Sequence, residues 1–307
     1  MLRRRFLVIW FAIGLVPIGC TQSEAPPSIV PTATYRLVAQ NLRPLDTSRN
    51  RYVLWLRTQT KPGNDTAWLA IPLTNWTKSK NGDVLTFSGK LPQSAATDSL
   101  GRALLSIEPL ANLGNPTSIL LAGSISNSFA ALSTDSSAIK DYSNAQGSVL
   151  FTTKSIDTNR AKNEFYLMRF VNGVAQSSIT DLPIAKAGWA YGLWVLDSSF
   201  FPPHQFFYGS FLEPNGPSVG AGVDSNSSSG TYPFPGGYNP APLTDGAARI
   251  VVTLEPTSNL HPKHPLVPSP IEIMTAPLHD IISLGDTTRF ENIWDANVPT
   301  GTLTITH

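Results

Sequence analysis

The 307-residue chain contains a single cysteine, Cys20, so no disulfide bond can brace the fold from within. Charged side chains are also scarce: they make up 14% of the residues, against about 25% in an average globular domain. The net charge of +1 argues against the clustered basic face that nucleic-acid binding requires. We therefore expect a fold stabilised by buried apolar side chains, with no nucleic-acid partner.

Recognisable catalytic motifs are missing as well. The sequence has no Gly-x-Ser-x-Gly elbow, no phosphate-binding loop and no dinucleotide fingerprint. His261 and His264, with Glu255 upstream, are zinc-binding residue types. Their spacing, however, is neither that of a helical His-Glu-x-x-His motif nor that of a zinc finger, and a solvated loop is favoured. We predict a non-enzymatic protein with no catalytic residues, metal or cofactor. A glycan-active enzyme with an unrecognisable site is the less favoured alternative.

Long apolar runs are confined to the N-terminus. Three arginines at 3–5 precede an uncharged apolar run over 6–19. About 14 apolar residues are too few to span a bilayer comfortably, and this order of parts is typical of a secretory signal. The sequence therefore predicts a signal peptide over 1–19 and export of the residues that follow.

The end of that segment, Ile18-Gly19-Cys20, resembles the bacterial lipoprotein signal, although Pro17 stands where Leu is usual. The resemblance implies that Cys20 is fatty-acylated and anchors the chain to a bacterial membrane, on its periplasmic or cell-surface side. The polar, proline-containing residues 20–31 would then form a tether. An ordinary signal peptide with an incidental cysteine, or an uncleaved anchor, is the alternative.

From residue 35 onward the pattern is typical of β-strands, because short apolar runs with period-two alternation are separated by turn residues. Strands are predicted over 35–39, 52–57, 84–87, 103–107, 149–153, 165–171 and 249–254. The Asn172-Gly173 pair favours a type I′ hairpin turn, since both residues tolerate positive φ. Only 128–142 and 277–284 suggest a turn or two of helix. The predicted fold class is all-β.

The chain also repeats itself, and this is its strongest fold signal. Residues 52–56 (YVLWL) recur as 191–195 (YGLWV), and 102–109 (RALLSIEP) match 249–256 (RIVVTLEP) without a gap. Neighbouring blocks match in the same order, which chance does not explain. We predict two homologous β-domains over 32–126 and 147–275. A Ser/Ala-rich linker over 127–146 would join them, and a C-terminal extension over 276–307 would follow.

The second copy also carries a family resemblance. Its blocks, in order, are Asn172-Gly173-Val174-Ala175, Leu182-Pro183, Tyr191-Gly192-Leu193-Trp194-Val195 and Val252-Thr253-Leu254-Glu255-Pro256. This order resembles the extracytoplasmic C-terminal domain of anti-sigma-K-type factors, and the first copy resembles it more weakly. The resemblance implies two tandem Ig-like β-sandwiches outside the cytoplasm. The sigma-binding segment and the connecting membrane helix of that family have no counterpart here, so the expectation covers the fold and not the regulatory activity.

Three residues recur in both copies: Tyr52, Trp55 and Glu108 in the first, and Tyr191, Trp194 and Glu255 in the second. Alternate residues of a strand point to opposite faces, so the tyrosine and the tryptophan face opposite ways. Structural packing is favoured over a sugar- or peptide-stacking role. The glutamates either pair with Arg102 and Arg249 or accept backbone N–H bonds at a turn. A catalytic carboxylate pair must converge within about 5–10 Å, which equivalent positions in separate domains have no reason to do.

The best candidate binding residues are Tyr232, Phe234 and Tyr238, which lie in a loop rich in Gly and Pro. If exposed, these rings suit an envelope protein or a glycan as partner; packing at the end of the domain is the alternative. We predict a cell-envelope lipoprotein that acts as a binding or scaffold module and contacts the membrane through its N-terminal lipid. An extracytoplasmic sensory protein related to anti-sigma-factor outer domains is the alternative function.

Overall fold

The computed structural model describes residues 33–43, 45, 47–58, 68–79, 84–92, 100–111, 114–134, 139–153, 163–198, 204–214, 236–238, 248–257, 267–278, 285 and 287–307. Strands dominate these ranges, in which the one helix is the four-residue α2 (Trp294–Asn297). The all-β fold class is therefore confirmed. In the same ranges no helix has the length and apolar character needed to cross a membrane.

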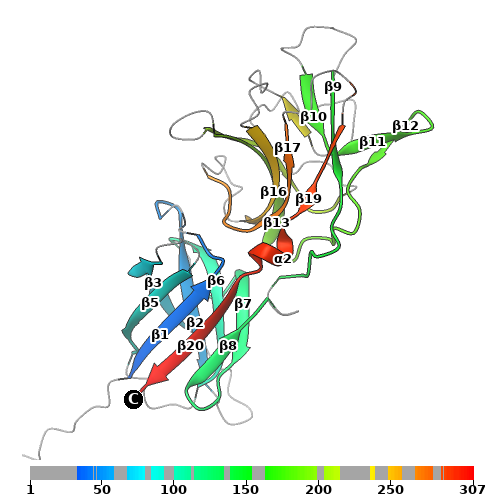
Figure 1. The fold of residues 1–307 in the computed structure, drawn as a ribbon. Coiled ribbons are helices and arrows are strands. Elements are labelled where there is room, and N and C mark those ends of the chain that lie inside the picture. The colour runs from blue at the N-terminus through cyan, green and yellow to red at the C-terminus, as the bar shows by residue number, and fades with distance from the viewer. Residues whose placement is uncertain are drawn as a thin grey trace, which may run out of the picture.

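The strands gather into two units (Figure 1). The first unit has a five-stranded sheet in the order β4-β5-β1-β20-β8 and a four-stranded sheet in the order β3-β2-β6-β7. Tyr52 of β2 and Phe87 of β5 meet edge to face with ring centroids 6.0 Å apart, so buried side chains of the two sheets meet in one core. The strands of this unit are β1 (Thr34–Gln40), β2 (Asn50–Thr58), β3 (Trp68–Leu73), β4 (Trp76–Lys78), β5 (Val84–Lys90), β6 (Leu100–Pro109), β7 (Ser118–Ser124), β8 (Phe129–Leu132) and β20 (Thr300–Thr306).

The second unit comprises β9 to β19, and α2 follows it on the way to β20. The unit has a five-stranded sheet in the order β14-β13-β16-β17-β19, a four-stranded sheet in the order β15-β10-β9-β18, and the separate hairpin β11-β12. Phe165 of β10 and Tyr208 of β14 lie between the two larger sheets, with ring centroids 6.2 Å apart. The strands are β9 (Ser148–Thr153), β10 (Asn163–Tyr166), β11 (Met168–Val171), β12 (Val174–Ser177), β13 (Trp189–Asp197), β14 (His204–Phe211), β15 (Gly236–Tyr238), β16 (Ala248–Pro256), β17 (Glu272–Pro277), β18 (Thr287–Arg289) and β19 (Glu291–Asn292).

The C-terminal residues return to the first unit. Strand β20 pairs with β1 on one side, where Leu303 lies opposite Leu37, and with β8 on the other. Alternate residues of β20 are buried, as expected for a strand with one face on a core. The second unit is therefore inserted between β8 and β20.

Two ranges that were predicted to lie outside the two domains contain strands of the first unit. Residues 127–146, predicted as a linker, contain β8, and residues 276–307, predicted as an extension, contain β20. The helix suggested over 128–142 is wrong at its start, because β8 forms there. Both strands lie outside the matched blocks of the repeat, so comparing the two copies gave no sign of them.

The repeat predicted from the sequence occupies matching places in the two units. Sheets β3-β2-β6-β7 and β14-β13-β16-β17 have the same strand order. Tyr52 lies opposite Ile107, and its counterpart Tyr191 lies opposite Leu254, which is the counterpart of Ile107. The pairing with the next strand shifts register after Leu105 in the first unit and after Val252, the matching residue, in the second. This register and this irregularity are therefore common to the two copies.

Candidate functional site

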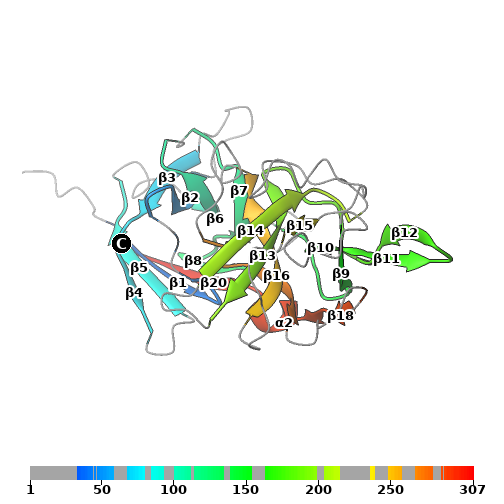
Figure 2. The ribbon, with the colours of Figure 1, turned by 90° about the horizontal axis from the view of Figure 1, so that it is seen from above.

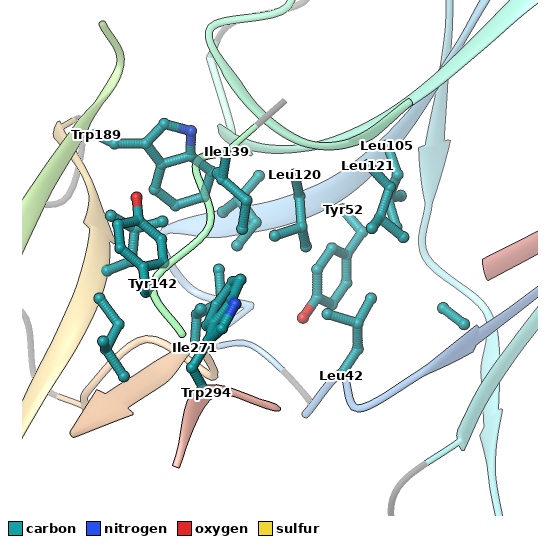
Figure 3. Close-up of a cluster of buried hydrophobic side chains, with 14 of the residues drawn as sticks. Leu42, Tyr52, Leu105, Leu120, Leu121, Ile139, Tyr142, Trp189, Ile271 and Trp294 are labelled. Atoms are coloured by element: carbon teal, nitrogen blue, oxygen red, sulfur yellow. The ribbon is translucent and has the colours of Figure 1, made fainter. Parts of the chain in front are cut away.

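The two units meet at a buried junction. The chain passes between the units twice, once between β8 and β9 and once between β19 and β20. Figure 3 shows side chains from the two units, and from both crossings, in one buried cluster. The labelled members are Leu42, Tyr52, Leu105, Leu120 and Leu121 of the first unit, Trp189 and Ile271 of the second, and Ile139, Tyr142 and Trp294 of the crossings.

Tyr142 lies at the centre of the aromatic part of this junction. Its ring meets Trp294 edge to face with centroids 4.8 Å apart, and meets Tyr191 in the same way at 6.0 Å. The Asn292 amide donates hydrogen bonds to the carbonyls of Tyr142 and Ala145, each at 2.8 Å. The two crossings are therefore bound to each other as well as to both units.

Direct hydrogen bonds also join β7 of the first unit to the start of β13. The Ser118 hydroxyl donates to the Gly188 carbonyl at 2.9 Å, and the Trp189 indole N–H donates to the Ile119 carbonyl at 3.2 Å. Gly188 has φ +87°, and a Cβ at this position would lie 2.2 Å from the Thr117 carbonyl oxygen. Only glycine permits this close approach of the two backbones.

An ion-pair network adds a charged contact between the units. Glu272 of the second unit is almost fully buried, and Arg43 of the first unit reaches it at 2.7 Å. Arg249, on the neighbouring strand β16, reaches the same carboxylate at 3.1 Å. Burial by itself would raise the pKa of Glu272, but the Arg249 hydrogen bond and the charges of Arg43 and Arg249 outweigh it and hold the pKa below its usual range.

The tryptophans of the repeat are buried in both units. Trp55 and Trp194 are 0% exposed, so neither presents a ring face to a ligand. The Trp55 indole N–H donates to Ser106 Oγ at 2.7 Å, and the Trp194 indole N–H donates to Glu255 Oε1 at 3.0 Å. These side chains serve packing and buried polar contacts.

The tyrosines and glutamates of the repeat hold the ends of strands. The Tyr52 hydroxyl donates to the Arg43 carbonyl at 2.8 Å, and the Tyr191 hydroxyl donates to the Pro183 carbonyl. Glu108 accepts the Thr117 N–H at 2.7 Å just before β7. Glu255 accepts the Ser269 N–H at 2.9 Å shortly before β17. Of the two roles considered for the glutamates, the backbone role is thus present in both copies, while Arg249 forms its ion pair with Glu272.

Several residues singled out in the sequence lie outside the described part of the chain: Cys20, Tyr232, Phe234, His261 and His264. Tyr238 is the last residue of β15, where its backbone lies opposite Glu164 of β10. Within the described ranges no group of three His, Cys, Asp or Glu side chains is placed to hold a metal ion.

Among the described elements, the β11-β12 hairpin exposes the most large apolar side chains. Its turn residues, Asn172 and Gly173, have φ of +51° and +77°, which confirms the predicted type I′ geometry. Val174, Phe170 and Val171 around the turn are 61%, 48% and 37% exposed. Figures 1 and 2 show the hairpin projecting from the body of the second unit.

The Asn172-Gly173 pair predicted this hairpin, but the sequence did not indicate that it projects from the body of the second unit. The sequence also did not indicate Gly188, Tyr142 and Glu272 as residues of the junction. None of the three belongs to a matched block of the repeat. Their importance comes from contacts between segments far apart in the chain, for which the sequence carries no local signal.

Comparison of the chain with protein-family models, with curated proteins and with solved structures finds no match in any of the three. A functional interpretation therefore depends on the geometry described above.

Proposed function

We propose that this protein is a lipid-anchored protein of the bacterial cell envelope that works as a rigid two-domain arm. It acts as a scaffold or binding module, not as an enzyme, and presents its second unit away from the membrane. The observation that carries the proposal is the junction, where two chain crossings, a shared apolar cluster and an ion-pair network join the two units.

Each domain of the arm is an Ig-like β-sandwich in this proposal. The support is that the described strand pairs of the two principal sheets in each unit are antiparallel, and that side chains of both sheets meet in the core between them. Such domains recur in cell-surface proteins as rigid frames for binding loops and hairpins.

The direction of the arm follows from the pairing of β1 with β20. Thr34 lies opposite Thr306, at the end of the first unit that is remote from the second unit (Figure 1). The 14 residues from Cys20 to Thr34 span at most about 50 Å when extended. A lipid on Cys20 would therefore hold the first unit near the membrane and leave the second unit outermost.

Fatty-acid labelling of the full chain tests the anchor. We expect a Cys20→Ser variant to lose incorporation of an alkyne fatty acid and to leave the membrane fraction, because no other cysteine exists to carry the lipid. An Ile184→Cys variant tests exposure, since Ile184 is 59% exposed on the second unit. A membrane-impermeant maleimide should label it from outside the cytoplasmic membrane. Undiminished lipid labelling, or maleimide labelling that requires lysis of that membrane, would contradict the proposal.

A sensory role related to anti-sigma-factor outer domains is the second candidate. The blocks that carry this resemblance include the central strands β13 and β16, where Tyr191 and Trp194 are fully buried, so its support concerns the fold. Deleting the gene should change the transcripts of one sigma-factor regulon if the role is sensory. A scaffold predicts an unchanged transcript profile.

A further inference from the structure

We propose that the β11-β12 hairpin is the docking element of the arm, and that it binds an extended segment of a partner protein as a third strand along the outer edge of β12. The inference rests on the proposed function and assigns the binding role to one place in the fold. Its position, its apolar tip and its open strand edge each support it.

The position of the hairpin suits contact with another molecule. In both ribbon views it lies at the end of the molecule opposite the C-terminus (Figures 1 and 2). Because β1 begins beside the end of β20, the hairpin is also remote from the start of the described chain. An anchor at Cys20 would leave the hairpin pointing outward from the arm.

The base of the hairpin is firmly held. Met168 is fully buried and packs with Leu150 and Tyr166, and Ala175 packs against the same cluster. The Ser177 hydroxyl donates to the Pro214 carbonyl at 2.9 Å. A two-stranded ribbon is marginally stable by itself, so this base is what keeps the projecting part in place.

The side chains beyond the base are apolar and exposed. Val171 and Val174 lie directly opposite each other next to the turn, on the same face of the ribbon, and Val174 is 61% exposed. Arg169 is the one charged residue of 168–177, and by register it shares that face with Gln176. A complementary segment therefore places an apolar side chain beside Val174 and is neutral or acidic overall.

Strand β12 offers the open edge. Strand β11 lies beside β9, and within the described ranges no strand pairs with the far side of β12. The two-residue turn makes Val171 and Val174 a hydrogen-bonded pair, so the next pair, Phe170 and Ala175, is non-hydrogen-bonded. The N–H and C=O of Ala175 consequently point away from β11. The sequence of β12, Val-Ala-Gln-Ser, has none of the charges or prolines that protect edge strands.

A protein strand fits these features better than other occupants do. The hairpin exposes only three large apolar side chains, whereas a stable globular interface buries ~800 Å² per partner. Strand addition takes its affinity from main-chain hydrogen bonds instead. The apex of the hairpin consists of the exposed Asn172 and Gly173. Insertion into a bilayer would bury that polar apex before the valines, and hydrocarbon cannot satisfy its backbone groups.

Peptide selection against the purified full-length protein in detergent tests the proposal. The probe is a library of randomised nine-residue peptides. We expect the selected peptides to be neutral or acidic with apolar side chains at alternate positions. In an Ala175→Pro variant, which removes the outward N–H, their binding should weaken at least tenfold. The matched Ala175→Ser variant keeps that N–H and should bind within twofold of the parent.

A second pair of variants leaves the backbone groups intact. Val174→Lys places a charge at the edge and should also weaken binding at least tenfold, whereas Val174→Thr should bind within about threefold. In the complex, amide exchange at Ala175 should slow at least tenfold. Selection of no peptide, or equal binding by the Ala175→Pro and Val174→Lys variants, would overturn the proposal.

Two other results would assign the hairpin a different occupant. Slowed exchange at Ala175 on reconstitution into phospholipid vesicles, without peptide, would point to the bilayer. A concentration-dependent dimer in the ultracentrifuge that Ala175→Pro abolishes would point to a second copy of the chain. Each of these results overturns the partner-strand proposal. Lipid labelling at Cys20 is measured in a separate experiment. The lipid-anchor proposal and the hairpin proposal can therefore fail independently of each other.

Discussion

At the scale of single residues, two buried tyrosines beside the junction use their hydroxyl groups differently. The Tyr191 hydroxyl donates to the Pro183 carbonyl, whereas the Tyr142 hydroxyl interacts only weakly with the Tyr191 hydroxyl and has no partner at normal hydrogen-bond geometry among the described residues. Burial raises the pKa of Tyr142 to about 12, so this group remains protonated at neutral pH. Both rings pack in the junction, but of the two hydroxyl groups only that of Tyr191 donates a hydrogen bond to a backbone carbonyl, that of Pro183.

We therefore expect Tyr191→Phe to lower the free energy of unfolding by about 1–3 kcal/mol, because it leaves the Pro183 carbonyl without its donor. The matched Tyr142→Phe variant should change it by less than about 0.5 kcal/mol, since only weak contacts, such as that with the Tyr191 hydroxyl, are lost. Urea unfolding of the full chain measures both. Equal losses in the two variants would contradict this account of the hydroxyl groups.

Two glycines with positive φ, Gly173 and Gly188, allow the cost of backbone strain to be measured apart from the cost of steric crowding. A Cβ added at Gly173 has no neighbouring atom within 4 Å. Gly173→Ala should therefore lower the free energy of unfolding by about 1 kcal/mol, from the left-handed conformation alone. Ala at Gly188 would meet the same strain and also the Thr117 carbonyl, so Gly188→Ala should cost roughly 3 kcal/mol or more. Thermal unfolding distinguishes them. A Gly188→Ala variant as stable as Gly173→Ala would show that the two backbones can separate without loss.

At the scale of elements, β20 is an interior strand of the first unit. It lies between β1 and β8 in the five-stranded sheet, and it buries Leu303 and Ile305 in the core. It also closes the second crossing of the chain. A unit that an alignment of the two repeats would treat as N-terminal is therefore completed by residues 300–306.

A chain that ends at Pro299 should lose the ordered first unit, because β8 would lose its partner in the sheet, β1 would keep only β5, and two core side chains would be removed. Amide exchange in β1 and β8 should approach the rate of unfolded chain, and the cooperative unfolding transition should weaken. A chain that lacks only His307, which lies beyond β20, is the control and should unfold like the parent. Slow exchange in β1 after the larger deletion would contradict the prediction.

Several strands could be predicted because their signals are local. All the strand ranges predicted from alternation and turn residues contain strands of the structure, and the Asn172-Gly173 turn was predicted from the tolerance of its residues for positive φ. Strand β8, by contrast, falls in a range read as a linker, because its pattern is short and its partner β20 lies about 170 residues away. Local pattern cannot identify such a partner.

At the scale of the whole molecule, acid should weaken the junction. Glu272 has a pKa below its ordinary value in the folded protein, so its contribution to stability is fully present above the ordinary glutamate pKa of about 4.3. It is lost as the pH falls through the lowered value. We expect the stability of the parent to fall with pH below about 4.3 more steeply than that of Glu272→Gln.

The same variant should lose about 1–3 kcal/mol at neutral pH, where its charge partners Arg43 and Arg249 remain. Urea unfolding at a series of pH values measures both effects. Parallel pH profiles for the parent and the variant would show that other carboxylates control the acid response.

The two crossings also predict how the molecule responds to a cut. A protease site inserted between Ser133 and Lys140 should be cleaved without separating the fragments. Strand β20 on one fragment stays paired with β1 on the other, and the junction remains buried. Size-exclusion chromatography should show one species in buffer and two in denaturant. Two species in buffer would mean that the units are held together by the chain alone.

The sequence by itself determined the all-β class, the duplicated blocks with their common register, and the tight turn of the β11-β12 hairpin. These features follow from side-chain alternation and from backbone preferences that act over a few residues. Only the tertiary structure decided that β20 completes the first unit and that Tyr142, Gly188 and Glu272 join the two units. It also decided that the hairpin stands clear of the body. Those outcomes depend on which distant segments pack together, and no short stretch of sequence encodes such contacts.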